Sequence, residues 1–151
     1  MSNEGLIAKA STTINAPIAK VWDALTNPEA IKQFMFGTET VSEWKKDSPI
    51  VWKGMWEGKP YEDKGVILNI EPQRMLQYSH FSPLSGAPDV PENYHTLTYE
   101  LSKKEDKTLV VLSQDNNSNE EEREHSQKMW EMMLMSLKNV LEEEGNPGRI
   151  G

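Results

Sequence analysis

The sequence predicts an α+β fold in which a curved antiparallel sheet of about seven strands wraps around one long C-terminal helix. Three features of the sequence favour this fold. Apolar and polar residues alternate with period two over most of the stretch between 38 and 114. A segment with the period of an α-helix follows, and two short helical segments come directly after the first strand.

The stretch from Asn119 to Glu144 is expected to form the long helix. Ser118 or Asn119 suits an N-cap, each with a glutamate three residues later. Apolar residues then recur at spacings of three and four, which indicates one broad apolar face: Met129, Trp130, Met133, Leu134, Leu137, Val140 and Leu141. Because no other stretch can form a helix of this length, it must be the main cover of the sheet.

The shorter elements account for the rest of the chain. The first strand is expected at 8–14, followed by a short helix beginning at Pro17 and a second one ending at Phe34. Period-two patterns place further strands at 38–44, 50–57, 66–71, 75–81, 95–101 and 109–114. The proline-rich loop 82–93 either covers a binding site or is a surface excursion. Together these elements describe a helix-grip arrangement, in which the gap between sheet and helix is a natural cavity.

Length and composition limit the classes of function. The 151 residues fit one domain, 1–151, with a core at about 6–144 and a flexible tail at 145–151. The absence of cysteine excludes disulfides, thiolate catalysis and thiolate metal sites. With no membrane-spanning apolar run and no signal pattern, we expect a soluble, cytoplasmic protein. The net charge of −8 argues against nucleic acid and anionic membranes as partners.

The sequence contains no motif for metal or cofactor chemistry. His80, His95 and His125 lack the paired spacing of zinc ligands. The glycines are too dispersed to form a phosphate-binding loop, and no set of nucleophile and base is recognisable. We therefore expect no metal and no cofactor, and we assign no catalytic residue.

Several segments resemble a known superfamily. The segment 16–29 (APIAKVWDALTNPE) resembles the opening helix signature of the SRPBCC (START-like) superfamily. The segments 49–54 (PIVWKG), 63–72 (DKGVILNIEP) and 114–117 (QDNN) look like the branch named for the activator of the ninety-kilodalton heat-shock chaperone's ATPase. The resemblance covers roughly 8–141 and implies the helix-grip fold for nearly the whole chain.

This resemblance implies a range of functions, because the superfamily includes lipid carriers, hormone receptors, polyketide cyclases and co-chaperone domains. In the eukaryotic activator, the similar domain follows a separate N-terminal domain that engages the chaperone. This chain begins within a few residues of its first expected strand. We therefore expect no chaperone-engaging domain of that kind in it.

Large aromatic side chains and histidines fall on the inferred inner faces of the strands. Four of the 8 methionines also lie within two turns of the long helix, and methionine adapts to variable ligands as well as to gaps in a core. The candidate ligand-binding residues are therefore Trp52, Trp56, Tyr78, His80, His95, Tyr99, Met129, Trp130 and Met133. The alternative is that these aromatic and methionine side chains pack an ordinary core, with the histidines bonded to backbone or tyrosine hydroxyls.

Three functions fit these features. The leading hypothesis is non-enzymatic binding of a small apolar or amphipathic molecule between the sheet and the long helix. The second is a chaperone-associated interaction domain, which the resemblance implies. The third is a cyclase- or hydratase-like enzyme in which His80, His95 or a tyrosine carries a proton.

Overall fold

The computed structural model describes residues 6–35, 37–56, 58–83 and 86–144. The expected tail at 145–151 lies outside these residues. The helices are α1 (Ile18–Thr26), α2 (Pro28–Phe34) and α3 (Glu120–Glu144), with a 3-10 turn at Pro91–Asn93. The strands are β1 (Ala8–Ile14), β2 (Glu39–Ser42), β3 (Pro49–Trp56), β4 (Lys59–Glu71), β5 (Met75–His80), β6 (His95–Lys104) and β7 (Lys107–Gln114).

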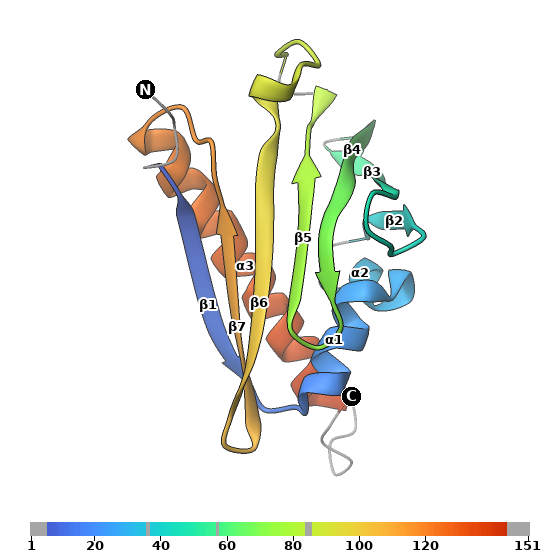
Figure 1. Cartoon of the computed structure of the whole chain (residues 1–151), viewed down its shortest axis with the longest axis vertical. Helices are drawn as coiled ribbons and strands as arrows, with labels where there is room; N and C mark the ends of the chain where they lie inside the picture. The colour runs from blue at the N-terminus through green and yellow to red at the C-terminus, as the bar shows by residue number, and fades with distance from the viewer. Residues whose placement is uncertain (1–5, 36, 57, 84–85, 145–151) are drawn as a thin grey trace.

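The strands form one antiparallel sheet in the order β1-β7-β6-β5-β4-β3-β2. Figure 1 shows α3 running obliquely across one face of this sheet, with α1 and α2 near its C-terminal end. The predicted α+β arrangement, with its seven-stranded antiparallel sheet and long C-terminal helix, is confirmed.

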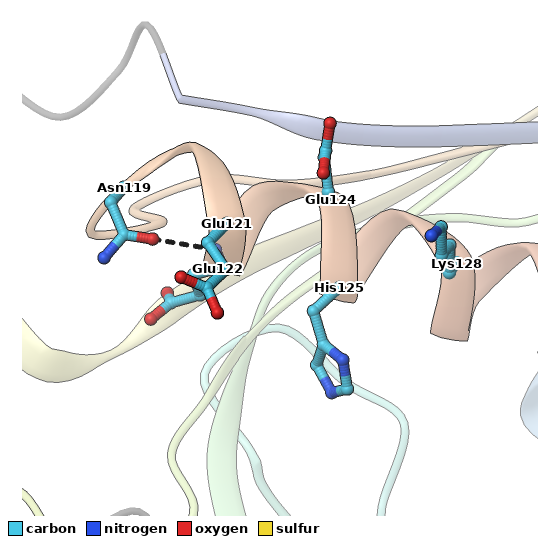
Figure 2. Close-up of a pocket in the computed structure, with 6 residues that line it drawn as sticks. All are labelled: Asn119, Glu121, Glu122, Glu124, His125 and Lys128. Atoms are coloured by element: carbon cyan, nitrogen blue, oxygen red, sulfur yellow. Dashed lines mark hydrogen bonds between the residues drawn. The ribbon is translucent and has the colours of Figure 1, made fainter.

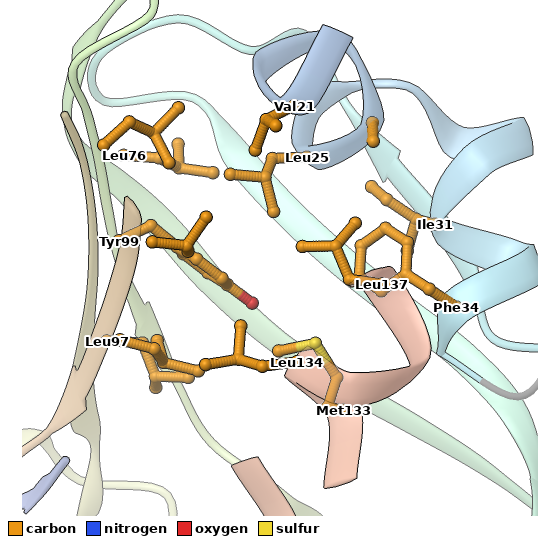
Figure 3. Packing of buried hydrophobic residues seen from close by; sticks show 14 of the residues in the cluster. Val21, Leu25, Ile31, Phe34, Leu76, Leu97, Tyr99, Met133, Leu134 and Leu137 are labelled. Atoms are coloured by element: carbon orange, nitrogen blue, oxygen red, sulfur yellow. The ribbon is translucent and has the colours of Figure 1, made fainter. Parts of the chain in front are cut away.

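The long helix begins where the capping pattern predicts. Asn119 Oδ1 accepts a hydrogen bond from the backbone N–H of Glu122 at 2.8 Å. The carboxylate of Glu122 in turn accepts from the backbone N–H and the hydroxyl of Ser118, at 3.2 and 2.8 Å. The helix then buries a stripe of four side chains, most of them labelled in Figure 3: Met133, Leu134, Leu137 and Leu141. The expectation that Met129 shares this apolar face is wrong, because its side chain lies at the border of a narrower stripe and is 50% exposed.

An irregularity in β4 changes which side chains face the helix. Simple alternation groups Val66, Leu68 and Ile70 on one face of the sheet. The register shifts between Ile67 and Asn69, however, and a bulge of this kind moves the following residues to the opposite face. As a result Ile67 is fully buried and Ile70 packs against the same core, whereas Val66 and Leu68 are exposed.

The proline-rich loop is fastened to the face of the sheet that points away from α3. Lys64 of β4 forms an ion pair with Asp89 of the loop, and the Tyr94 hydroxyl donates to Asp89 Oδ1 at 2.6 Å. The rings of Phe81 and Tyr94 stack with centroids 5.1 Å apart. Lys64 alternates along its strand with the inner-facing Asp63, so these contacts lie on the outer face. The described parts of the loop therefore do not cover the inner face.

Gly65 of β4 lies close to the backbone of β5. A Cβ atom at this position would lie 1.7 Å from the backbone oxygen of Ser79. Only glycine fits there without moving a strand, and the backbone of the partner strand cannot give way as a flexible side chain would.

We predict that Gly65→Ala lowers the free energy of unfolding by about 3 kcal/mol or more, because the added methyl group forces the two strands apart. Urea denaturation measures this change. Gly58→Ala is the matched control, since Gly58 has a φ of +80° with open space around it and should cost only about 1 kcal/mol. Equal losses in the two variants would contradict the close strand approach.

Candidate ligand-binding site

Polar and aromatic side chains form a row across the inner face of the sheet. Thr40 of β2 is the direct partner of Trp52 on β3, and Trp52 is the partner of Asp63 on β4. His80 and His95 are direct partners on β5 and β6. Because α3 crosses the sheet obliquely, no helix lies behind the upper ends of β3, β4 and β5 in Figure 1. The row thus lies beside the long helix rather than beneath its centre.

Three aromatic rings form the floor of this region. The Trp52 ring centroid lies 5.0 Å from that of Tyr78 and 5.0 Å from that of His80. The ring of Tyr78 lies 6.1 Å from that of Tyr99. Figure 3 shows the Tyr99 side chain projecting from its strand toward the side chains of α3. Trp52, Tyr78 and Tyr99 are all buried, so the sequence placed them on the correct face.

These rings fill most of the space between the sheet and the helices. The void bordered by these rings has a volume of about 10 Å³, whereas a single water molecule needs roughly 10–15 Å³. Its lining comes from α1, α2, the segment after β2, and the sheet: Leu25, Ile31, Phe34, Met35, Trp44, Ile50, Trp52, Leu76, Tyr78 and Tyr99. In this conformation the aromatic side chains pack against one another instead of surrounding an open, ligand-sized cavity.

Within this row, Asp63 contacts His80. Its Oδ2 lies 2.9 Å from His80 Nε2, and the two side chains are only 16% and 23% exposed. The other oxygen, Asp63 Oδ1, is buried and has no hydrogen-bond partner among the described residues. Thr40 Oγ1 is likewise buried without a partner in this part of the chain. An unsatisfied buried polar atom costs on the order of 1–3 kcal/mol, so these two oxygens are unusual features of the site.

The remaining expected site residues have different environments. His95 Nδ1 lies 2.9 Å from the backbone oxygen of Asp115, which can only accept, so this ring nitrogen donates. Met133 is buried against the core, whereas Met129 is exposed. The side chain of Trp56 lies outside the described residues. The structure therefore brings Trp52, Tyr78, His80, His95 and Tyr99 together on one face and Met133 close to the core that they form.

Trp130 contributes to anchoring the first half of α3. Its Nε1–H donates to Gln114 Oε1 at 2.7 Å, and the Gln114 amide donates to Asn117 Oδ1 and Ser126 Oγ, each at 3.3 Å. Asn117 is fully buried and donates to the backbone oxygen of Leu6 at 2.8 Å. This network joins the end of β7 to α3, so the polar atom of Trp130 is already engaged.

Sequence reasoning missed Thr40, Asp63 and the amides of this network. A signal for Asp63 was present, because it shares the period-two positions of Gly65 and Ile67 before the bulge. The stronger hydrophobic alternation of 66–70 favours the other set of positions. Nothing comparable marks Gln114 or Asn117, whose importance comes from their burial between elements that are far apart in sequence.

A second depression, open to solvent, lies along the first turns of α3. It has a volume of about 590 Å³ and is lined by Asn119, Glu121, Glu122, Glu124, His125 and Lys128. Figure 2 shows Glu124 and His125 pointing in opposite directions from the helix, so the side chains do not converge on a common point. No group of three or more potential metal-ligating side chains occurs in the described part of the chain. We regard this depression as solvated surface.

Burial changes the acidity of the two tyrosines in the floor. It raises the pKa of Tyr99 to about 12. It also raises the pKa of Tyr78 well above its ordinary value, with the neighbouring Tyr99 adding to the effect. Both hydroxyls therefore remain protonated at neutral pH, which makes either tyrosine a poor general base there. A proton-transfer role would fall to His80 or His95.

We predict that Tyr99→Phe reduces the loss of stability at alkaline pH. The folded protein keeps the Tyr99 proton up to about pH 12, whereas the unfolded chain begins to lose it near pH 10. The stabilising contribution is thus fully present below about pH 10 and is lost as the pH rises toward the folded pKa, at up to about 1.4 kcal/mol per pH unit. Urea denaturation between pH 9 and 11 measures how the free energy of unfolding changes with pH in wild type and in Tyr99→Phe. Identical slopes in the two proteins would contradict the raised pKa.

Among the residues that the structure describes, no helix combines the length and the apolar composition needed to cross a membrane.

Comparisons with known proteins place the chain in a family. No curated protein matches the sequence. A protein of Cytophaga hutchinsonii, known from its solution structure, is 55% identical over 96% of this chain and 99% of its own, with a TM-score of 0.84. The Aha1 dimer from Colwellia psychrerythraea is 21% identical over 90% of this chain and 96% of its own, with a TM-score of 0.70.

CalU16 from Micromonospora echinospora is 22% identical over 93% of this chain and 84% of its own, with a TM-score of 0.69. At such identities these two structures share the fold with this chain, and nothing follows about a shared activity. The family model described as "Activator of Hsp90 ATPase homolog 1-like protein" matches residues 15–142. The chain therefore belongs to the family of Activator of Hsp90 ATPase homolog 1-like proteins.

Proposed function

We propose that this protein binds a small apolar or amphipathic molecule without chemical conversion, on the inner face of the sheet beside α3. The observation that carries the proposal is the aromatic floor of Trp52, Tyr78 and Tyr99, which is bordered by the Asp63–His80 pair. Small-molecule sites in proteins typically combine such apolar walls with a few placed polar groups. In Figure 1 the upper ends of β3, β4 and β5 extend beyond α3, and the Asp63 and His80 side chains that border the floor are partly exposed, so a molecule could approach from this side.

Binding requires some rearrangement, because the void at the floor has a volume of only about 10 Å³. Met133 is the side chain best suited to move, since it is unbranched and packs between α3 and the core. Trp130 would border the ligand on the helix side, and His80 and His95 on the strand side, whereas the exposed Met129 leaves the proposed set. Trp56 belongs to the proposed set through its strand position, which shares the inner face with Trp52.

The proposal states that the bound molecule is not chemically converted, and this can be tested against an enzymatic function. The raised pKa values of Tyr78 and Tyr99 make the two buried tyrosines poor general bases at neutral pH. The Asp63–His80 pair is then the arrangement through which an enzyme of this fold could transfer a proton. Recovery of a chemically altered ligand after incubation would favour the enzyme over the carrier.

The proposal predicts that wild-type protein takes up an alkyl probe such as dodecanol, while Met133→Trp binds it at least about tenfold more weakly, because the added bulk fills the space beside the floor. In the packed core this variant should also lose about 1–3 kcal/mol of stability. Isothermal titration and urea denaturation measure the two effects.

Met132→Trp is the matched control, since Met132 lies on the same helix and its side chain is 65% exposed. It should bind dodecanol like the wild type. If wild type takes up no alkyl probe, or if both tryptophan variants bind equally well, the proposed site is rejected.

A second candidate function is a chaperone-associated interaction domain. The observation that favours it is a group of exposed methionines on the outer side of α3: Met129, Met132 and Met135, with exposures of 50%, 65% and 52%. Exposed thioether side chains adapt to the surface of a protein partner. The family description names an activator of the Hsp90 ATPase, which gives a chaperone of that type as the partner to test.

This candidate predicts that the protein raises the ATPase rate of a purified Hsp90-type chaperone, and that Met132→Gln combined with Met135→Gln weakens the effect at least about fivefold. The control is Met55→Gln, because Met55 is 65% exposed but lies on β3. Absence of stimulation by wild type, or equal losses in the double variant and the control, would reject this candidate.

A further inference from the structure

Two buried oxygen atoms distinguish the proposed site from the rest of the core. Among the described residues, Thr40 Oγ1 and Asp63 Oδ1 are the two buried side-chain polar atoms that have no hydrogen-bond partner. Other buried polar side chains nearby are satisfied: the Thr38 hydroxyl, for example, lies 2.8 Å from the Tyr61 hydroxyl. Native proteins rarely leave such atoms unpaired, so each of these two exceptions requires an explanation.

Both exceptions flank the same tryptophan. Thr40 is the cross-strand partner of Trp52 on one side, and Asp63 is its partner on the other. The three residues therefore form a row of about 10 Å on one face of the sheet, since adjacent strands lie roughly 4.8 Å apart. Thr40 is only 3% exposed, whereas the Asp63 side chain is 16% exposed and so lies nearer to the solvent. Asp63 thus stands at the opening of the site.

The chemistry of Asp63 defines what can bind to its oxygen. A carboxylate accepts hydrogen bonds and donates none. One of its oxygens is already bonded to His80 Nε2 at 2.9 Å, which leaves Oδ1 for an incoming donor. A carboxylate or phosphate on the ligand would offer no proton and would repel Asp63 at contact distance. The protein's net charge of −8 acts in the same direction.

We propose that the molecule bound over Trp52 carries a hydrogen-bond-donating head group, an amine or a hydroxyl, which Asp63 Oδ1 receives. The apolar part of the molecule packs on the rings of Trp52 and Tyr78, and the Thr40 hydroxyl binds a second polar group where the molecule has one. This assignment deepens the proposed function and rests on it. It names the ligand class as amphipathic amines and alcohols and excludes fatty acids.

The test compares three probes with the same alkyl chain: dodecylamine, dodecanol and dodecanoate, each below its micelle concentration. Wild-type protein is expected to bind the amine and the alcohol at least about tenfold more tightly than the carboxylate. In Asp63→Asn the preference for the amine over the carboxylate should fall to within about threefold, because the amide is neutral and can also donate. Isothermal titration gives all the affinities.

Glu62→Gln is the matched control, because Glu62 precedes Asp63 on β4, is 62% exposed and loses the same charge outside the row. It should keep the wild-type preference. A loss of preference in Glu62→Gln equal to that in Asp63→Asn would overturn the role of Asp63. If Asp63→Asn fails to fold, equal binding of the three probes by wild-type protein would still overturn the donor head group.

The outcomes separate the two proposals. Wild-type protein that binds dodecanoate as tightly as dodecylamine would overturn the donor head group and leave ligand binding intact. Wild-type protein that binds none of the three probes would remove the proposed function, and the head-group assignment with it. Tight binding of the amine and alcohol alone, lost selectively in Asp63→Asn, would support both.

Discussion

The apolar stripe of α3 is buried against the inner face of an open sheet, and within the described part of the chain α3 is the one long helix that covers this face. Met133, Leu134, Leu137 and Leu141 are each at most 3% exposed, and burying one such side chain contributes about 1.5–3 kcal/mol. The helix is also attached in both of its halves. In the first half Trp130 donates to Gln114, and in the second half Lys138 donates to the backbone oxygen of Thr13 at 2.9 Å. These contacts set the oblique course of α3. This course determines which part of the inner face the helix covers.

Because the helix crosses obliquely, the inner face has two different parts. Beneath α3 the core is dense, and the rings of Tyr78 and Tyr99 contribute to it. Beside α3, polar side chains replace apolar ones, and Asp63 and Thr40 retain unpaired oxygens. A protein that needed only a stable core would gain by replacing these polar groups with apolar ones of similar shape. Their position next to Trp52 is what connects the architecture of the sheet to the proposed binding of a small molecule.

Membership of the Hsp90 ATPase activator-like family explains the fold, and it leaves the function to the residues of this chain. Two surfaces of the molecule have the chemistry for recognition. The inner one is small, aromatic and bordered by polar atoms, which suits a small molecule. The outer one carries the exposed methionines of α3, which suits a protein. The two surfaces lie on opposite sides of the same helix, so a ligand that displaced Met133 would also act on the element that presents the outer surface.

The sequence by itself determined the order of elements, the long amphipathic helix and the inner faces of β3, β5 and β6, because periodicity is a local property of the chain. It thereby identified Trp52, Tyr78 and Tyr99 as interior residues. Only the tertiary structure decided that these rings fill the space between sheet and helix, since packing depends on distances between elements remote in sequence. The tertiary structure also decided the bulge in β4, the exposure of Met129 and the pairing of Asp63 with His80. Each depends on how strands and helix meet, which no periodic pattern records.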